Sequence, residues 1–361
     1  MISSKNILTV GPEYKNPKGG IAQVLYSYNK FVYNGFKHVR SGGGSQAFSK
    51  LYYFGKGLVM FSTKLLFDSS IKVVHIHTAS NSDFKRNSFY ARIARLFNKK
   101  VILHVHGGGF KDYYSKNKCF VKHQLYKANA IVALSEYWRQ FFAEDLKCKN
   151  VFVVHNIIPT PNYKPQKEKY IFNLLYLGHI YEKKGIFDLV SIIKDHREEY
   201  KGRLMLHIGG GLYEVDRLLN ILKEDKLDDV IKFEGWVSGD KKEELLNTSN
   251  AYILPSYAEG VPISILEAMS YHLPIIATEV GGIPSIVGDK NGILIEPGNK
   301  QQLKSAIDVL INSEQQREKK GEASYQISLE YQPQNVIKEL NILYSSIGIK
   351  SVSYTHLTLP T

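Results

Sequence analysis

Short apolar runs alternate with segments of helical period along the whole chain. In the first half the helical segments cover 21–33, 84–97, 118–129 and 136–145. They are separated by five β-type runs: KNILTV, IKVVHIH, KVILHVH, AIVAL and NVFVVHN. A repeated strand–helix order predicts a parallel sheet, because parallel neighbours need a helical crossover between them. We therefore expect an α/β fold with a doubly wound sheet.

A proline-rich stretch interrupts this order, and the same order then starts again. The segment IIPTPNYKPQKEK cannot continue as a helix, because proline lacks a backbone donor. Six further β-type runs follow: YIFNLLYLGHI, RLMLHIGGG, VIKFEGW, AYILPS, PIIATEV and GILIEP. Helical patterns between them cover 185–199, 213–225 and 240–248, and another begins at about 263. The second half is therefore predicted to form another doubly wound domain.

These patterns divide the chain into two Rossmann-like domains, 1–162 and 163–330, facing an interdomain crevice where a ligand binds. A terminal helix at 331–350 is expected to cross back to the first domain. Residues 351–361, SVSYTHLTLPT, contain no acidic residue or lysine and have no helical period. We interpret this segment as a non-native tail.

Composition narrows the class of protein. The 361 residues are 43% hydrophobic and 22% charged, which is the balance of a packed globular protein. The two cysteines, Cys119 and Cys148, provide neither a disulfide framework nor a cysteine metal site, which favours a reducing compartment. With no apolar run of signal-peptide or membrane-span type, a cytoplasmic location is expected.

The positive charge is concentrated in the first half. Residues 1–165 contain 25 Lys and Arg against 7 Asp and Glu, whereas 166–361 contain 22 against 27. The segment DFKRNSFYARIARLFNKK predicts a basic amphipathic helix with Phe89, Tyr90, Ile93, Leu96 and Phe97 near one face. Such a helix could bind the anionic inner face of the cell membrane. An apolar face buried against the sheet fits the same pattern. No helix-turn-helix, zinc-finger or aromatic RNA motif accompanies the charge, so nucleic acid is not an expected partner.

The most specific motif is EGVPISILEAMS. Pro262 can start a helix, whose free backbone amides then form an anion site, with Glu259 before it and Glu267 about one turn inside. This segment resembles the E-x7-E motif of retaining GT-B glycosyltransferases, the large family four (glycosyl transferases group 1). The resemblance implies that Glu259 contacts the donor sugar and Glu267 holds the ribose hydroxyls. It also assigns donor binding to Gly260, Val261, Pro262 and Ile263.

A second segment, YLGHIYEKKGIFDL, resembles the G-R-x(4)-K-G motif of the same family. Gly178 and Lys184 match the pattern, and His179 stands where the family has arginine. A lysine beside a diphosphate neutralises the charge that grows on the leaving group, so no divalent metal is required. His179 departs from the family pattern, because a neutral imidazole has one hydrogen-bond donor, whereas the guanidinium of arginine binds phosphate with a bidentate fork. Lys183 is a candidate to compensate for the missing arginine.

Two further segments lie in the first half. Gly19 and Gly20, between the first strand and the first helix, resemble the family's N-terminal glycine pair and allow backbone amides to approach a ligand. His106, after the strand VILHVH, matches the family histidine beside the donor sugar. The alternating histidines at 75, 77, 104 and 106 also fit a metal site. No carboxylate or cysteine completes a ligand set, so no metal is expected.

The resemblance implies a glycosyltransferase (EC 2.4) that moves a sugar from a nucleotide-diphosphate sugar to a hydroxyl acceptor with retention of configuration. The acceptor is expected to be a growing or lipid-linked glycan in bacterial capsule or exopolysaccharide synthesis. Two alternatives stay open. One is a catalytically impaired nucleotide-sugar-binding protein, and the other is an inverting GT-B transferase with Asp112 or His106 as the base.

Overall fold

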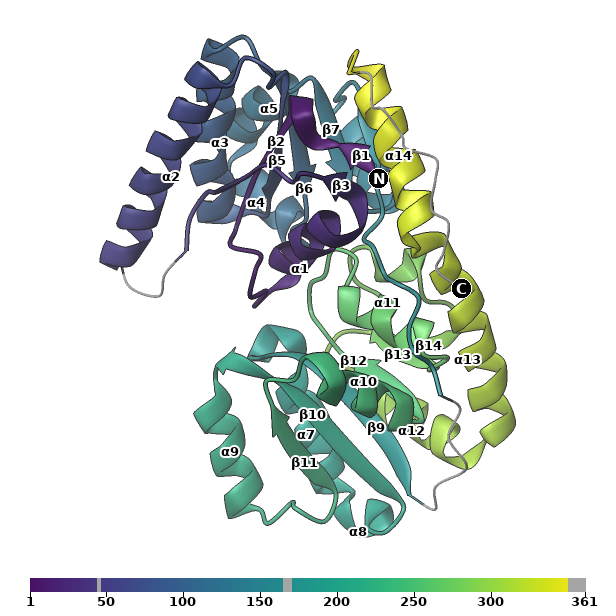
Figure 1. Cartoon of the computed structure of the whole chain (residues 1–361). Coiled ribbons are helices and arrows are strands. Elements are labelled where there is room, and N and C mark those ends of the chain that lie inside the picture. The colour runs from purple at the N-terminus through teal and green to yellow at the C-terminus, as the bar shows by residue number, and fades with distance from the viewer. Residues whose placement is uncertain (44–46, 165–170, 350–361) are drawn as a thin grey trace. The chain divides into compact units, whose positions relative to one another are not determined.

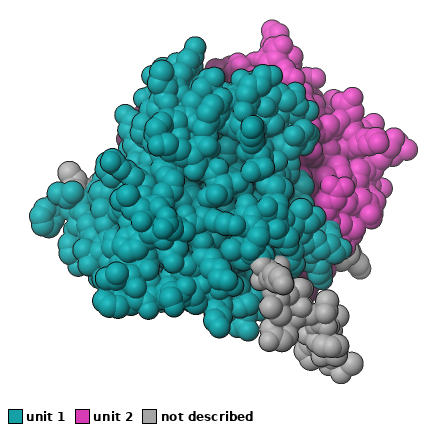
Figure 2. All heavy atoms as spheres, turned by 90° about the horizontal axis from the view of Figure 1, so that it is seen from above, with its two compact units in different colours: residues 1–157, 332–361 teal, residues 158–331 magenta. Residues whose placement is uncertain are grey.

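The computed structural model describes residues 1–43, 47–164 and 171–349 (Figure 1). The chain forms two compact units, distinguished by colour in Figure 2. Unit 1 contains Met1–Ile157 and Gln332–Thr361, and unit 2 contains Ile158–Tyr331. The divisions after residues 157 and 331 lie close to the predicted ones after 162 and 330. The predicted tail, 351–361, and part of the proline-rich linker lie outside the described residues.

Unit 1 is built on six parallel strands in the order β4-β2-β5-β6-β7-β8. Their bounds are β2 Ile7–Gly11, β4 His38–Arg40, β5 Val73–Thr78, β6 Lys100–Val105, β7 Ala130–Ala133 and β8 Val151–Val153. The short strands β1 (Ile2–Ser3) and β3 (Tyr33–Asn34) pair separately. Every residue of β2 and β5 is buried, as expected for a parallel sheet covered on both faces. The strand order reverses between β2 and β5, and the carboxyl ends at such a switch point favour ligand binding.

The helices of unit 1 include two, over 47–67 and 110–116, that the sequence pattern did not predict. The bounds are α1 Gly20–Ser27, α2 Ala47–Phe67, α3 Asn81–Leu96, α4 Phe110–Lys116, α5 Lys118–Tyr126, α6 Glu136–Gln140 and α14 Pro333–Ser346. Short π-helical segments, Tyr28–Val32 and Phe141–Asp145, continue α1 and α6. The longer of the two missed helices, α2, is apolar on nearly every side and contains two glycines, so it lacks the one-sided period that identifies a surface helix. The shorter one, α4, has only seven residues.

Helix α3 differs from the expected arrangement with one apolar face. Tyr90 is fully buried, whereas Phe89 and Leu96 are exposed. The face toward the sheet is formed mainly by smaller residues such as Asn87, Ala91 and Ala94, which allow close packing. The prediction of one continuous apolar face on this helix was therefore wrong.

Unit 2 also contains six parallel strands, in the order β11-β10-β9-β12-β13-β14. The strands are β9 Phe172–Ile180, β10 Leu204–Tyr213, β11 Ile231–Gly235, β12 Ala251–Leu254, β13 Ile275–Thr278 and β14 Gly292–Ile295. The helices are α7 Ile186–Asp195, α8 Arg197–Tyr200, α9 Val215–Glu224, α10 Gly239–Thr248, α11 Ile263–Ser270, α12 Lys300–Asn312 and α13 Glu314–Ser328. This is the doubly wound order of a Rossmann-like sheet, and its switch point lies between β9 and β12. The predicted α/β class is confirmed.

Among the described residues, no helix combines the length and apolarity needed to cross a bilayer.

Candidate active site

The candidate donor residues of unit 2 lie at the carboxyl ends of the two switch-point strands. Gly178 and His179 are near the end of β9, and the Tyr176 hydroxyl donates a hydrogen bond of 2.8 Å to the carbonyl of His179. The His179 ring lies among aromatic side chains, with its centroid 5.6 Å from that of Tyr213 and 6.2 Å from that of Trp236. The position predicted from sequence is therefore at the ligand-binding edge of the sheet.

A glycine fixes the turn that carries Lys184. Lys184 ends the 3-10 turn Glu182–Lys184, and Gly185 follows with a φ of 67°. A Cβ atom at Gly185 would lie 1.9 Å from the carbonyl oxygen of Pro255, so no other residue fits there without a shift. The backbone amide of Tyr257 also donates to the carbonyl of Lys183 over 2.9 Å. These contacts hold Lys184 against the loop that follows β12.

Lys184 and Glu259 form a direct ion pair in this loop. Lys184 Nζ lies 2.5 Å from Glu259 Oε1, and Glu259 is buried. Burial disfavours the charged form of Lys184. The attraction and the hydrogen bond from Glu259 outweigh this effect of burial, so the pKa of Lys184 is raised. The two residues singled out from separate motifs thus meet as a charged pair, and the lysine stays protonated at neutral pH.

Two glycines that we had not assigned to the site determine the shape of the Glu259 loop. Gly281 has a φ of 55°, and a Cβ atom there would lie 1.9 Å from the Glu259 carbonyl oxygen. The Gly282 amide donates to the Gly260 carbonyl over 2.8 Å, and its own Cβ would lie 2.2 Å from that oxygen. The adjacent glycines in VGGIP were the available sequence signal, because such pairs mark close backbone approach.

Helix α11 begins directly after this loop. Pro262 is its N-cap residue and Ile263 its first residue, as predicted, and the cap makes no side-chain hydrogen bond. The first amides of a helix have no intrahelical partner, so this end is suited to an anion. Further along α11, Glu267 Oε1 accepts a hydrogen bond of 2.6 Å from Lys242 Nζ on α10. Lys242 carried no signal in the sequence, because its position depends on the packing of α10 beside α11.

The candidate glycines of unit 1 lie between β2 and α1. Gly19 is the N-cap residue of α1 and Gly20 its first residue. A Cβ atom at either position would meet nothing within 4 Å. Packing against the described residues therefore does not require glycine here, and the open space leaves the start of α1 accessible to a ligand.

His106 follows β6 and is held by its backbone and its ring. Its amide donates to the carbonyl of Thr78 over 2.8 Å, and its Nε2 lies 2.9 Å from Nδ1 of His77. Burial lowers the pKa of His106 to about 3, so its imidazole is neutral at pH 7. His77 is fully buried, and its Nε2 has no hydrogen-bond partner in the part of the chain that the structure describes.

The hydrogen-bond network assigns the tautomers of this pair. A buried unpaired acceptor is tolerated better than a buried unpaired N–H, so the proton of His77 belongs on Nδ1, where it is donated to His106 Nε2. The His106 proton then belongs on its own Nδ1. This arrangement makes His106 a hydrogen-bond donor and, with its low pKa, a poor proton acceptor.

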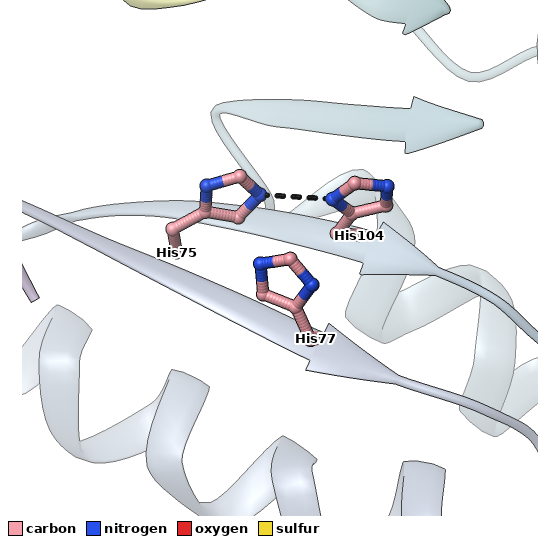
Figure 3. A group of neighbouring side chains, drawn as sticks. All are labelled: His75, His77 and His104. Atoms are coloured by element: carbon pink, nitrogen blue, oxygen red, sulfur yellow. Dashed lines mark hydrogen bonds between the residues drawn. The ribbon is translucent and has the colours of Figure 1, made fainter. Parts of the chain in front are cut away.

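Three further ring contacts extend this group into the core (Figure 3). Ring nitrogens of His75, His77 and His104 all lie within 4.8 Å of one another. His75 Nε2 and His104 Nδ1 face each other at 3.2 Å, and His75 Nδ1 lies 2.8 Å from the Tyr344 hydroxyl on α14. The His77 ring packs beside both other rings, with its centroid 4.6 Å from each.

The three rings form a hydrogen-bonded stack. Histidine binds a metal through the lone pair in its ring plane. The facing nitrogens of His75 and His104 already bond each other, and His77 is tilted by only 29° and 35° from their ring planes. Metal ligation would require breaking that bond and turning the rings.

The two doubly wound parallel sheets form the fold of GT-B glycosyltransferases. Sucrose-phosphate synthase from Thermosynechococcus elongatus has a similar structure, with a TM-score of 0.76 at 16% identity, covering 95% of this chain and 99% of that one. An Anabaena protein, HepE, solved with UDP and glucose, gives a TM-score of 0.75 at 16% identity over 94% of this chain and 99% of its own.

Sequence comparison gives the family. Residues 159–327 match the family "Glycosyl transferases group 1". An uncharacterized glycosyltransferase of Methanocaldococcus jannaschii is 25% identical over 89% of this chain and 86% of its own length. The amylovoran biosynthesis glycosyltransferase AmsD of Erwinia amylovora is 27% identical over 59% of this chain and 61% of its own. The chain is a glycosyltransferase, and its match to glycosyl transferases group 1 lies within the second unit.

Proposed function

We propose that the protein transfers a sugar from a nucleotide-diphosphate sugar to a hydroxyl group with retention of anomeric configuration and without a divalent metal. The observation that carries the proposal is the Lys184–Glu259 pair at the switch point of unit 2, next to the open N-terminus of α11. A fixed ammonium and helix amides beside one carboxylate suit a diphosphate next to a sugar.

Each residue then has a defined task. Lys184 and the amides at the start of α11 stabilise the diphosphate as the bond from C1 to its oxygen breaks. Glu259 binds hydroxyls of the sugar, and Glu267 binds those of the ribose. The acceptor oxygen forms the new bond to C1, and its proton passes to the departing phosphate oxygen on the same face. Gly178 and His179 complete the donor side of unit 2. The family resemblance implies separate roles in unit 1 for Gly19, Gly20 and His106.

The inverting alternative requires a base in unit 1. His106 suits this task poorly, because its pKa of about 3 makes it a weak base and its Nε2 already accepts a hydrogen bond from His77. Asp112 is exposed on α4. NMR assignment of the product anomer separates the two mechanisms. An inverted product whose formation is abolished by Asp112→Asn would replace our proposal.

We further propose that the acceptor is a growing or lipid-linked glycan of a bacterial surface polysaccharide, used at the cytoplasmic face of the membrane. The annotated roles of relatives support this class, since AmsD is named for amylovoran biosynthesis and WcaL of Escherichia coli for putative colanic acid biosynthesis. The catalytically impaired alternative, a protein that binds nucleotide sugars without turnover, rests on His179 in place of arginine.

The test begins with a panel of UDP-, GDP-, ADP- and dTDP-sugars, measuring thermal stabilisation and release of nucleotide diphosphate with and without EDTA. We expect one selective thermal shift and EDTA-resistant release. A selective shift without turnover, in the presence of acceptor, would favour the binding protein. Loss of release on adding EDTA would overturn the metal-independent mechanism.

Variants then test the site. Lys184→Ala and Glu259→Gln should mainly lower kcat, and Glu267→Ala should mainly raise the donor KM. Breaking a buried ion pair also destabilises a protein, so the melting temperature of each variant must be measured. Lys194→Ala, which removes an exposed pair with Asp225 in the same unit, is the matched control. Wild-type kinetics in all three site variants would refute the assignment.

A further inference from the structure

Helix α2 has two faces with different surroundings. Gly57, Phe61 and Leu65 are buried against the rest of unit 1. A Cβ atom at Gly57 would lie 2.3 Å from the Arg40 carbonyl oxygen. The opposite face carries Phe48 and Leu66, exposed by 82% and 63%. The helix is therefore anchored by one apolar face, while among the described residues nothing covers its other apolar face.

The uncovered surface extends onto the neighbouring helix α3. The ring centroids of Phe54 on α2 and Phe89 on α3 lie 6.0 Å apart, and the two helices run next to each other in Figure 1. The exposed large apolar side chains are Phe48, Leu51, Tyr52, Val59, Met60, Leu66 and Phe67 on α2 and Phe89 and Leu96 on α3. We call these nine residues the α2–α3 patch. Contiguous exposed apolar surface of this kind marks an interaction site.

The charge around the patch is positive. No acidic residue occurs between Glu13 and Asp68, whereas that segment contains seven lysines and one arginine. Lys50 and Lys56 are exposed on α2 itself, and Lys85 and Arg92 are exposed on α3. Asp68, at the end of α2, is held by Lys37 at 2.6 Å. The patch thus combines aromatic and aliphatic side chains with unopposed cations.

We propose that the α2–α3 patch docks unit 1 on an anionic lipid bilayer, with Phe48, Val59 and Leu66 entering the boundary between headgroups and acyl chains. Lysines beside a row of apolar side chains suit anionic headgroups above a hydrocarbon layer. A second copy of this chain would bring positive surfaces together, and aliphatic side chains such as Val59 and Leu66 have no use against nucleic-acid phosphates. This inference deepens the proposed function, because it places a lipid-linked acceptor next to the enzyme.

The test is flotation of the full chain with two kinds of vesicle, phosphatidylcholine alone and phosphatidylcholine containing phosphatidylglycerol. We expect flotation only with the anionic vesicles, and weaker flotation in high salt. Leu66→Gln should lower the partition coefficient about tenfold, because the variant lacks the favourable transfer free energy of a leucine side chain that enters the acyl region. Lys56→Gln should lower it about fivefold, as one cation near an anionic surface does.

Ile342→Gln is the matched control, because Ile342 is an aliphatic residue of unit 1 on α14 with the same 63% exposure as Leu66. It should bind vesicles like the wild type. Equal effects of Leu66→Gln and Ile342→Gln, or no wild-type flotation, would overturn the proposal. So would a concentration-dependent dimer that Leu66→Gln abolishes, because the patch would then join two copies.

The assay contains neither donor nor acceptor, so its result is independent of the transferase reaction. An inactive protein that floats refutes only the proposed function. An active enzyme on a soluble acceptor that does not float refutes only the docking surface.

Discussion

Mild acid should selectively unfold unit 1, because its core contains neutral histidines. His75, His77 and His104 are at most 1% exposed. Burial lowers the pKa of His75 to about 3 and holds those of the other two well below the usual value of 6.5. The groups packed against them are the phenols of Tyr28 and Tyr344, with His106 also adding a repulsive contribution. No carboxylate of the described residues hydrogen-bonds these three rings to offset protonation.

The sign and size follow from linkage. The unfolded chain takes up protons as the pH falls through 6.5, whereas the folded unit does not until about pH 3, so the stabilisation is complete above pH 6.5 and is lost below it. At pH 5 each histidine contributes a loss of about 2 kcal/mol, from ~1.36 kcal/mol per pH unit. Three such losses total about 6 kcal/mol, comparable with the whole stability of many domains, ~5–15 kcal/mol. His106 and His38 add to this loss, because burial lowers their pKa values to about 3 and about 4. About 6 kcal/mol is therefore the minimum expected for unit 1.

The two tryptophans provide an assay for each unit. Trp138 is buried in unit 1 and Trp236 is half-exposed in unit 2. Urea unfolding of a Trp236→Phe variant at pH 7.5 and 5.0 follows unit 1, and a Trp138→Phe variant follows unit 2. We expect a loss of at least about 6 kcal/mol in the first and a much smaller loss in the second. In the first background, adding His104→Gln removes one titrating ring and should reduce the loss by about 2 kcal/mol.

A unit 1 stability that changes by less than about 1 kcal/mol between the two pH values would refute the reasoning, because none of the three histidines would then contribute its expected loss of about 2 kcal/mol. The same conclusion would follow if His104→Gln left the pH dependence unchanged.

Two other substitutions use contacts that differ between neighbouring residues. Gly57→Ala should destabilise unit 1 by more than about 1 kcal/mol, because the new Cβ would collide with backbone. Gly55→Ala, whose Cβ would meet nothing within 4 Å, should stabilise α2 by about 0.8 kcal/mol. Urea unfolding compares the two variants, and similar effects would contradict the packing argument. Lys242→Ala should raise the donor KM about fivefold with little change in kcat, because it removes the 2.6 Å partner of Glu267. Lys241→Ala should leave the donor KM unchanged. Steady-state kinetics test both variants, and a change confined to kcat would contradict the prediction.

The sequence was most informative where local rules determine structure. The strand that carries Gly178, the turn to Lys184 and the start of α11 after Pro262 depend on apolar period, glycine and proline, which are visible in a single sequence. Helix α2 was missed because it is apolar on both faces. The contact of Lys242 with Glu267 joins distant segments and leaves no local trace, whereas the glycine pair at Gly281 signals a close approach but not its partner, the Glu259 carbonyl.

The interrupted course of unit 1 has a consequence for biosynthesis. Its last helix, α14, is translated only after all of unit 2, yet its Tyr344 bonds His75, and its Glu339 accepts from the His155 amide over 2.9 Å. A nascent chain that emerges from the ribosome can therefore complete unit 2 while unit 1 still lacks one of its packing elements. A stop codon that removes α14 would damage the N-terminal unit, even though the lesion lies at the opposite end of the gene.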